Sequence, residues 1–319
     1  MTLYVGYKAS DIKPEMLDDG AVFHTLDIYH RHAIEKVHHA KAICAPHLPE
    51  GDWDKICFLT GPKLMSGELS LDMLQECHRV AEKCGCKVEV KFIGRERDRN
   101  DLLDKVRDRT DRVFKSEWPA SVPGGNRLMF TSYPGCFCHR RLDEGGLALA
   151  EVVTREVKSE EVGVKSCGSV NLLDMGCGCG LVGFLIADFI NKNKCATLHS
   201  SLLPLNLVLV DSHSRAVEAA TENAEKFGIP AEVILSDNGT PARMDGTFDV
   251  FVGNPPYYSD YRIADVFLET AKRALKPGGI CYTVCKNAAG LEPVQKKYFP
   301  EVEIIKRRGY AILKSICSE

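Results

Sequence analysis

The sequence has no apolar run long enough to cross a membrane, and it has no excess of positive charge. Its longest apolar stretch, residues 202–210, is interrupted by Pro204 and Asn206, whereas a transmembrane helix needs about 20 apolar residues. With 41 basic and 44 acidic residues, the net charge is −3. Any contact with nucleic acid therefore has to come from a local basic surface.

The chain also lacks a signal-peptide pattern and any Cys-x-x-Cys pair. Its first residues, Met1 to Val5, show no charged segment followed by an apolar one. The 14 cysteines include three Cys-x-Cys pairs, at positions 84/86, 136/138 and 177/179, whereas structural zinc sites favour Cys-x-x-Cys spacing. We therefore expect a cytosolic protein with reduced thiols, without a disulfide framework and without a bound metal.

Length and composition predict a globular protein of two domains. The 319 residues are 45% hydrophobic and 27% charged, which excludes wholesale disorder, and the length is about twice that of one ordinary domain. Proline and glycine are densest in Trp118–Asn126, a stretch expected to interrupt both helix and strand. A boundary there gives an N-terminal domain of residues 1–122 and a C-terminal domain of residues 123–319.

Strands and helices alternate in both halves of the chain. In the first half, residues 56–93 read as strand, helix and strand. In the second half, apolar runs predict strands at 170–175, 207–210, 231–235, 248–252 and 280–284, helices at 181–189, 214–227 and 264–275, and a closing antiparallel hairpin over 302–316. This alternation predicts a doubly wound, mostly parallel α/β sheet that binds its ligand at the carboxyl ends of the strands, together with an N-terminal α/β domain.

A glycine loop follows the first strand of the second half. Residues 174–180 read Asp-Met-Gly-Cys-Gly-Cys-Gly, and glycines at a strand-to-helix turn let backbone amides face a ligand. Residues 178–183 also match the G-x-G-x-x-G pattern of dinucleotide-binding enzymes. However, Asp211 lies 31 residues beyond Gly180 instead of about 20, and Asp174 would place a carboxylate beside a pyrophosphate. A nicotinamide dinucleotide is therefore disfavoured.

Acids at successive strand ends suit a cofactor that carries positive charge. S-adenosylmethionine has an ammonium group, a sulfonium group and a ribose diol, and it has no phosphate. Asp174 can attract the ammonium, Asp211 can accept both ribose hydroxyls, and Asp237 or Asn238 can bind the adenine edge. The predicted cofactor site comprises Asp174, Gly176, Cys177, Gly178, Gly180, Asp211, Ser212, Asp237, Asn238 and Asn254.

The strand at 248–252 runs into Asn254-Pro255-Pro256-Tyr257, which is the predicted catalytic turn. Two prolines after an asparagine stiffen the backbone, so the Asn254 side-chain oxygen and the Pro255 carbonyl can face one point. Two fixed acceptors suit an amine conjugated to a ring or a carbonyl, because they stabilise the charge that develops on nitrogen as a methyl group arrives. The Tyr257 ring offers a stacking face.

Together these residues resemble the class I S-adenosylmethionine-dependent N-methyltransferases, and more narrowly the small-subunit ribosomal RNA guanine-N2 methyltransferases of the methyltransferase small domain group. The resemblance covers about residues 127–319 and includes residues 134–138, 142–145 and a C-terminal part from Lys286 to Tyr310. It implies a Rossmann-like fold in which the acids bind the cofactor and the Asn-Pro-Pro-aromatic turn holds the target guanine. Some two-domain members have a degenerate methyltransferase-like N-terminal half, and residues 56–93 fit that pattern.

The expected function is methylation of guanine N2 in small-subunit ribosomal RNA, with that RNA or the small ribosomal subunit as partner. Expected substrate-binding residues are Phe137, His139, Arg140, Arg141 and Lys286; the basic residues at 139–141 lie beside the expected opening of the site and suit phosphate. Adenine-N6 and protein-glutamine-N5 methyltransferases share the Asn-Pro-Pro-Tyr turn, so these substrates stay open. A non-catalytic assembly factor that binds cofactor or RNA is the alternative from another class.

Overall fold

The computed structural model describes residues 1–18, 20–108, 114–158, 170–194, 205–256 and 261–318, and the chain divides into two compact units. Unit 1 is Met1–Ser116 with two later segments, Tyr133–His139 and Ser212–Arg215. Unit 2 is made of Glu117–Ser132, Arg140–Asp211 and Ala216–Glu319. No single cut of the sequence separates the units, and the boundary expected between residues 122 and 123 falls inside unit 2.

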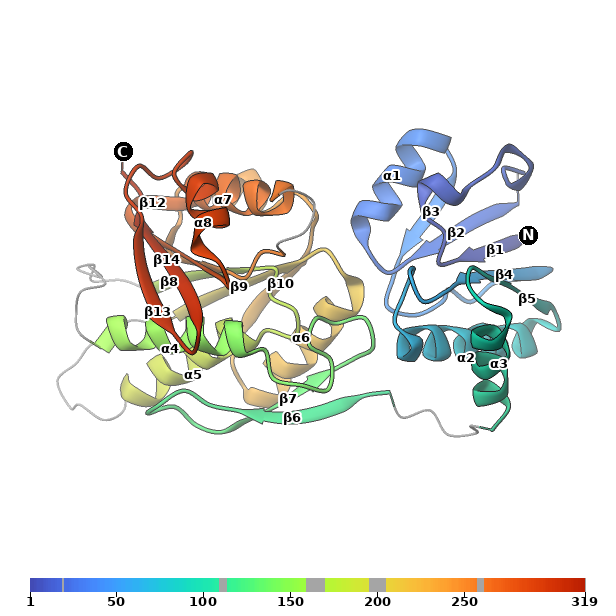
Figure 1. The fold of residues 1–319 in the computed structure, drawn as a ribbon, viewed down its shortest axis with the longest axis horizontal. Coiled ribbons are helices and arrows are strands. Elements are labelled where there is room, and N and C mark those ends of the chain that lie inside the picture. The colour runs from blue at the N-terminus through green and yellow to red at the C-terminus, as the bar shows by residue number, and fades with distance from the viewer. Residues whose placement is uncertain (19, 109–113, 159–169, 195–204, 257–260, 319) are drawn as a thin grey trace. The chain divides into compact units, whose positions relative to one another are not determined.

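Unit 1 is built on a five-stranded parallel sheet in the order β3-β2-β1-β4-β5. Its strands are β1 (Thr2–Val5), β2 (Ala21–Thr25), β3 (Lys41–Cys44), β4 (Lys55–Thr60) and β5 (Lys87–Phe92), and its helical elements are η1 (Ala9–Asp11), η2 (Pro14–Met16), α1 (Ile28–His38), α2 (Gly67–Cys84) and α3 (Glu96–Asp108). Figure 1 shows α1 on one face of this sheet and α2 with α3 on the other.

Alternate side chains of β4 explain why this sheet is covered on both faces. Ile56 and Phe58 pack into the core that includes α2, whereas Cys57 and Leu59 pack with Ile34 of α1. Successive residues of a strand point to opposite faces, so an uninterrupted apolar run predicts a strand buried on both sides. The strand, helix and strand predicted within residues 56–93 are β4, α2 and β5.

Unit 2 is built on a seven-stranded sheet in the order β10-β9-β8-β11-β12-β14-β13. The strands are β8 (Val170–Met175), β9 (Leu205–Asp211), β10 (Ala231–Leu235), β11 (Phe248–Gly253), β12 (Leu275–Cys285), β13 (Glu303–Arg307) and β14 (Tyr310–Ile316), and the helices are α4 (Glu144–Lys158), α5 (Leu181–Lys194), α6 (Ser214–Phe227), η3 (Ala242–Met244), α7 (Arg262–Ala274) and α8 (Ala288–Gln295). The strands from β10 to β12 are parallel, whereas β14 runs antiparallel to β12 and β13. Figure 1 shows α4 and α5 on one face, with α7 and α8 on the other.

The first five strands of the two sheets have the same relative order, 3-2-1-4-5. This order reverses direction beside the first strand, and ligands of open parallel sheets bind at that reversal. The predicted doubly wound fold is therefore confirmed, and the N-terminal sheet agrees with a degenerate copy of it. The copies differ after their first strands, because β1 leads into short 3₁₀ turns whereas β8 leads through glycines into α5.

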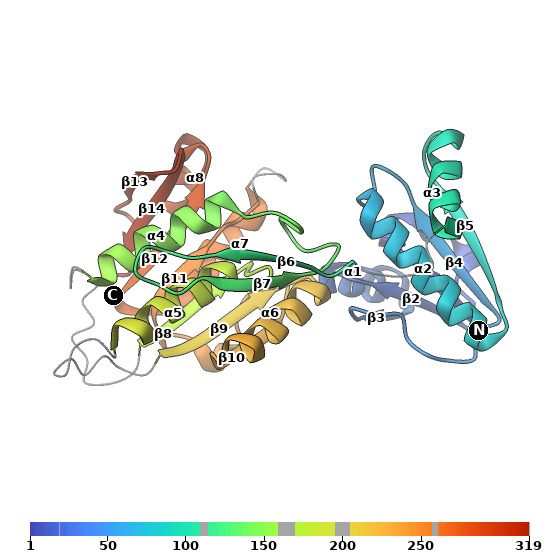
Figure 2. The same ribbon diagram turned by 90° about the horizontal axis from the view of Figure 1, so that it is seen from below.

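The expected interruption at Trp118–Asn126 is partly wrong. Residues 118–120 complete β6 (Ser116–Ala120), which pairs with β7 (Leu128–Ser132) in a two-stranded sheet. Such a ribbon tolerates Pro119 because a strand with a free edge needs fewer backbone donors. Buried Trp118 stacks on Phe130 with ring centroids 5.3 Å apart, and Figure 2 shows the ribbon on the side of the sheet that carries α4 and α5.

Candidate active site

The candidate site lies in unit 2 at the carboxyl ends of four neighbouring parallel strands, β10, β9, β8 and β11. Asp174 is the penultimate residue of β8, Asp211 is the last residue of β9, and Asn254 follows β11 directly. Because parallel strands end at one edge of a sheet, these three polar side chains are brought to the same edge. This is the edge that the sequence predicted.

The glycine loop after β8 has a conformation that only glycine adopts easily. Gly176, Gly178 and Gly180 have φ angles of +69°, +56° and +85°, in the left-handed region. A Cβ on Gly180 would lie 2.3 Å from a ring carbon of Phe184, so no side chain fits there. A Cβ on Gly178 would meet no atom within 4 Å. The Gly178 backbone therefore faces open space that a ligand can occupy.

Asp174 is a buried carboxylate at the centre of this edge. Its side chain belongs to a residue that is 2% exposed, and its Oδ2 accepts a hydrogen bond of 2.8 Å from the Gly183 amide. Burial raises the pKa of Asp174 to about 7, and the negative charges of Asp211 and Asp143 raise it further than burial alone would. An excess of negative charge in a water-poor place favours a ligand with a cationic group.

Asp211 is held by backbone amides on both of its sides. Its Oδ2 accepts a hydrogen bond of 2.8 Å from the Gly178 amide, and its carbonyl accepts one of 2.9 Å from the Ser236 amide. The carboxylate therefore connects the glycine loop to the end of β9. It is fixed beside the open space that Gly178 faces.

Asn254 is oriented by Asp143, a residue to which the sequence assigned no role. The Asn254 Nδ2 donates to Asp143 Oδ2 at 2.8 Å, while Asp143 Oδ1 accepts from the Gly145 amide at 3.0 Å. Burial raises the pKa of Asp143, although the hydrogen bonds from Gly146, Asn254 and Gly145 counteract this. Because Nδ2 is directed at a carboxylate, the Asn254 Oδ1 is the atom left to accept a proton donor from a substrate.

The other predicted cofactor residues are less concentrated. Asp237 is half-buried and Asn238 is exposed, and Asn238 Oδ1 accepts a hydrogen bond of 2.9 Å from the Ser236 hydroxyl. Cys177 is buried in the glycine loop. Ser212 belongs to unit 1, where its hydroxyl donates to Asp27 Oδ2 at 3.1 Å.

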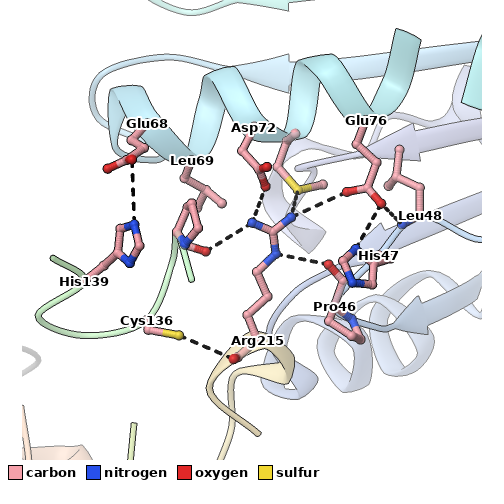
Figure 3. A network of polar contacts seen from close by, with 12 residues as sticks. Pro46, His47, Leu48, Glu68, Leu69, Asp72, Glu76, Cys136, His139 and Arg215 are labelled. Carbon is pink, nitrogen blue, oxygen red and sulfur yellow. Dashed lines mark hydrogen bonds and ion pairs between the residues drawn. The ribbon is translucent and has the colours of Figure 1, made fainter. Parts of the chain in front are cut away.

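The structure does not gather the predicted substrate-binding residues into one cluster. Phe137, which is 65% exposed, and His139 belong to unit 1, and His139 Nε2 lies 3.7 Å from Glu68 Oε1 on α2 (Figure 3). Arg140 and Arg141 are exposed in unit 2. The Lys286 ammonium lies 4.0 Å from the centre of the Tyr310 ring.

Of the predicted catalytic turn, the structure describes Asn254, Pro255 and Pro256, and Tyr257 lies outside the described residues. Pro255 is buried and Pro256 is half-buried. In the described part of the chain, no group of three or more metal-ligating side chains could hold an ion, and no helix there is long and apolar enough to span a membrane.

Comparison with known proteins identifies the region that contains this site. A family model described as "methyltransferase small domain" matches residues 127–314, more than half of the chain. A Bacillus subtilis protein, "uncharacterized protein YbxB", is 30% identical over 192 residues, which cover 58% of this chain and 84% of that protein.

Two further relatives have a stated activity. The proteins named ribosomal RNA small subunit methyltransferase C of Pseudoalteromonas translucida and Haemophilus influenzae strain PittGG are 29% and 24% identical over 189 and 186 residues. The alignments cover 58% and 57% of this chain, but only 48% and 49% of those relatives. This chain therefore matches about half the length of each.

A solved structure shares the fold of almost the whole chain. The T. thermophilus 16S rRNA N2 guanine methyltransferase, in complex with AdoMet and guanosine, superposes with a TM-score of 0.73. The match covers 99% of this chain and 87% of that one, at 15% sequence identity. At this identity the likeness establishes the fold.

Proposed function

Because the chain belongs to the methyltransferase small domain family, we propose that it is an S-adenosylmethionine-dependent methyltransferase that acts on guanine N2 of small-subunit ribosomal RNA. The observation that carries this proposal is the Asn254 carboxamide, which a partly buried carboxylate orients at the end of β11. The names of two relatives and the guanosine complex of the T. thermophilus enzyme support the substrate. A cytoplasmic location and the small ribosomal subunit as partner belong to the same proposal.

The charges at the strand ends fit S-adenosylmethionine. The mutual repulsion of Asp174, Asp211 and Asp143, which raises the pKa of Asp174, is relieved by a cationic ligand. Asp174 would hold the ammonium group, Asp211 the ribose hydroxyls, and Asp237 or Asn238 the adenine edge, with the Gly178 backbone alongside. When bound, the cofactor supplies a methyl group on a positively charged sulfur.

Asn254 and the backbone of Pro255 would hold the target amine. The lone pair of an amine on a purine is delocalised into the ring, so this nitrogen is a weak nucleophile. Acceptance of both N–H bonds by the Asn254 Oδ1 and the Pro255 carbonyl favours a pyramidal nitrogen and stabilises its developing positive charge. Asp143 keeps the acceptor oxygen, and not the amide nitrogen, directed at the substrate. The proton can leave to water after methyl transfer, so no strong general base is needed.

Substitution of Asp211 by alanine is expected to weaken the binding of S-adenosylmethionine by about 1–3 kcal/mol, the effect of losing hydrogen bonds to a charged group. Isothermal titration calorimetry measures this directly. Glu232→Ala, an exposed acid on the neighbouring strand β10, serves as the control and should bind normally. Equal affinity of the Asp211→Ala variant and the wild type would remove Asp211 from the cofactor site.

Substitution of Asp143 by asparagine is expected to lower kcat by about one to two orders of magnitude, because a misdirected reacting group can cost about 100-fold. An amide at position 143 no longer forces the Asn254 Nδ2 away from the substrate. Steady-state methyl transfer at saturating cofactor measures the effect. Glu144→Gln changes the adjacent exposed acid and should keep the wild-type kcat; a normal kcat in Asp143→Asn would refute the positioning role.

The proposed substrate class is tested with methyl-labelled S-adenosylmethionine and with RNA and protein from cells that lack this chain. We expect label in small-subunit ribosomal RNA. Label in protein would instead favour a protein-glutamine-N5 methyltransferase with the same site. Bound cofactor without labelled product would favour the non-catalytic assembly factor.

A further inference from the structure

Arg215 is a buried cation inside unit 1, although it follows the cofactor-site strand β9 by only four residues. The residue is 2% exposed, and its guanidinium forms ion pairs with Asp72 and Glu76 (Figure 3). Both acids lie on α2, four residues apart, so they share one face of that helix. Glu76 is completely buried and Asp72 almost so.

The remaining donors of Arg215 are satisfied by backbone carbonyls. Its Nε donates to the Pro46 carbonyl at 3.0 Å, and its Nη1 donates to the Pro134 carbonyl at 3.2 Å. The planar guanidinium presents donors in a fixed fork, which lysine cannot reproduce. A buried arginine that loses a partner is strongly destabilising, so this geometry is tightly determined.

The residues that precede Arg215 are fixed to the same unit. The Ser214 amide donates to the Leu26 carbonyl at 2.7 Å, and the Ser212 carbonyl accepts from the Ile28 amide at 3.0 Å. His213 forms an antiparallel bridge with Asp27. Ser212–Arg215 is therefore an anchored segment, held by its backbone at Ser212 and Ser214 and by a buried side chain at Arg215.

The anchored segment is covalently continuous with the cofactor site. Ser212 follows Asp211, whose carboxylate accepts from the Gly178 amide. The position of Asp211 is consequently set from two directions: by the glycine loop, and by a segment that belongs to unit 1.

We infer that Arg215 is a positioning residue for the cofactor site, and that its pairing with Asp72 and Glu76 makes cofactor affinity depend on the N-terminal half of the chain. The inference rests on the proposed function, since it takes S-adenosylmethionine as the ligand near Asp211. The anchored segment acts on Asp211 and not on Asn254. Its loss therefore affects cofactor binding and leaves the target amine's acceptors in place.

The first test is Arg215→Lys in the full chain, which retains the charge but loses the fork. We expect S-adenosylmethionine to bind about tenfold more weakly, within the usual range of coupling between distant parts of a protein. The KM for the cofactor should rise, while kcat at saturating cofactor stays at the wild-type value. Without ligand, hydrogen exchange of the Ser214 amide should become faster. Unchanged exchange and unchanged affinity would overturn the inference.

A second variant separates positioning from stability. Arg215→Met combined with Asp72→Leu and Glu76→Leu removes all three charges, and such replacements of buried ion groups are often neutral or stabilising. We expect thermal unfolding at or above the wild-type temperature, with cofactor affinity as weak as in Arg215→Lys. Wild-type affinity in this variant would show that packing alone positions Asp211, and would overturn the inference.

The matched control is Arg79→Met. Arg79 pairs with the same Glu76 from a half-exposed position on α2, and its loss should leave cofactor affinity unchanged. If the wild-type chain itself does not bind S-adenosylmethionine, the proposed function is wrong. The Ser214 exchange rates still decide the anchor in that case, because they are measured without ligand.

Discussion

Replacement of Asn254 by alanine is expected to slow methyl transfer by about 10²–10³-fold, the usual effect of removing one preorganised group that stabilises developing charge. The structure gives the physical reason. Asn254 Nδ2 is bound to Asp143 at 2.8 Å, so the acceptor oxygen is oriented before the substrate arrives. The amine nitrogen becomes positively charged in the transition state, and the alanine side chain has no acceptor to offer it.

Single-turnover transfer to RNA, together with cofactor binding by calorimetry, distinguishes this loss from misfolding. Asn206→Ala is the matched control, because Asn206 is an exposed asparagine near the start of β9, at the opposite end of the sheet's strands. The control should retain wild-type activity. Full activity in the Asn254→Ala variant would contradict the catalytic assignment; inactivity with retained cofactor binding would support it.

Replacement of Asp174 by asparagine is expected to stabilise the free protein above pH 7 and to weaken cofactor binding by at least tenfold. The lost affinity reflects a hydrogen-bonded partner for a charged group, about 1.5–3 kcal/mol. The stabilisation comes from removing a carboxylate that burial and two nearby acids make difficult to ionise. An asparagine oxygen can still accept the hydrogen bond from the Gly183 amide.

The pH dependence of Asp174 has a definite sign. Its pKa is raised from 3.8 to about 7 in the folded chain, so between these values the folded state holds a proton that the unfolded state has released. Stability therefore falls as pH rises through this window and is lowest above it. At about 1.4 kcal/mol per pKa unit, the full effect is on the order of 4 kcal/mol. A cationic ligand prefers the ionised form, so cofactor affinity rises with pH through about 7.

Denaturant unfolding at pH 5 and pH 8, without cofactor, measures the stability effect. The wild type should lose stability between these values relative to Asp174→Asn, and Asp104→Asn, which removes an exposed charge on α3, should follow the wild type. Calorimetry at both values measures the affinity effect. An Asp174→Asn variant that is less stable than the wild type at pH 8, or that binds the cofactor equally well, would contradict the assignment.

The fold of the second half could be predicted from the sequence because its signals are local. The strands at 170–175 and 231–235 and the helix at 214–227 have the predicted bounds, since each is an apolar run or periodic stretch between turn residues. The end of α7 is similar. The helix stops at Ala274, but the Pro-Gly-Gly that follows lies within β12 (Leu275–Cys285) and does not separate helix from strand as expected.

The first three strands of unit 1 were not predicted. β1 and β3 are only four residues long and β2 only five, and the apolar stripe of α1 is narrow, with Ile34 its one buried residue in the described structure. Short strands of a parallel sheet are stabilised by neighbours that lie far along the chain. Propensity within a short window therefore carries little information about them.

Within the site, the sequence predicted residue types at strand ends but not the contacts that orient them. Asp143 and Asn254 are 111 residues apart, and no spacing rule relates them. Arg215 follows the same principle. A charged residue at the start of a surface helix is ordinarily solvated, and only the acids of α2, more than 130 residues earlier in the chain, account for its burial.

The most direct test of the account is the identity of the methylated nucleoside. Small ribosomal subunits from cells that lack this chain are incubated with the purified protein and S-adenosylmethionine, and the RNA is digested and analysed by mass spectrometry. The account predicts N2-methylguanosine, absent when Asn254→Ala replaces the wild type. N6-methyladenosine would retain the mechanism but contradict the guanine assignment, and N2-methylguanosine formed at the wild-type rate by Asn254→Ala would contradict the mechanism itself.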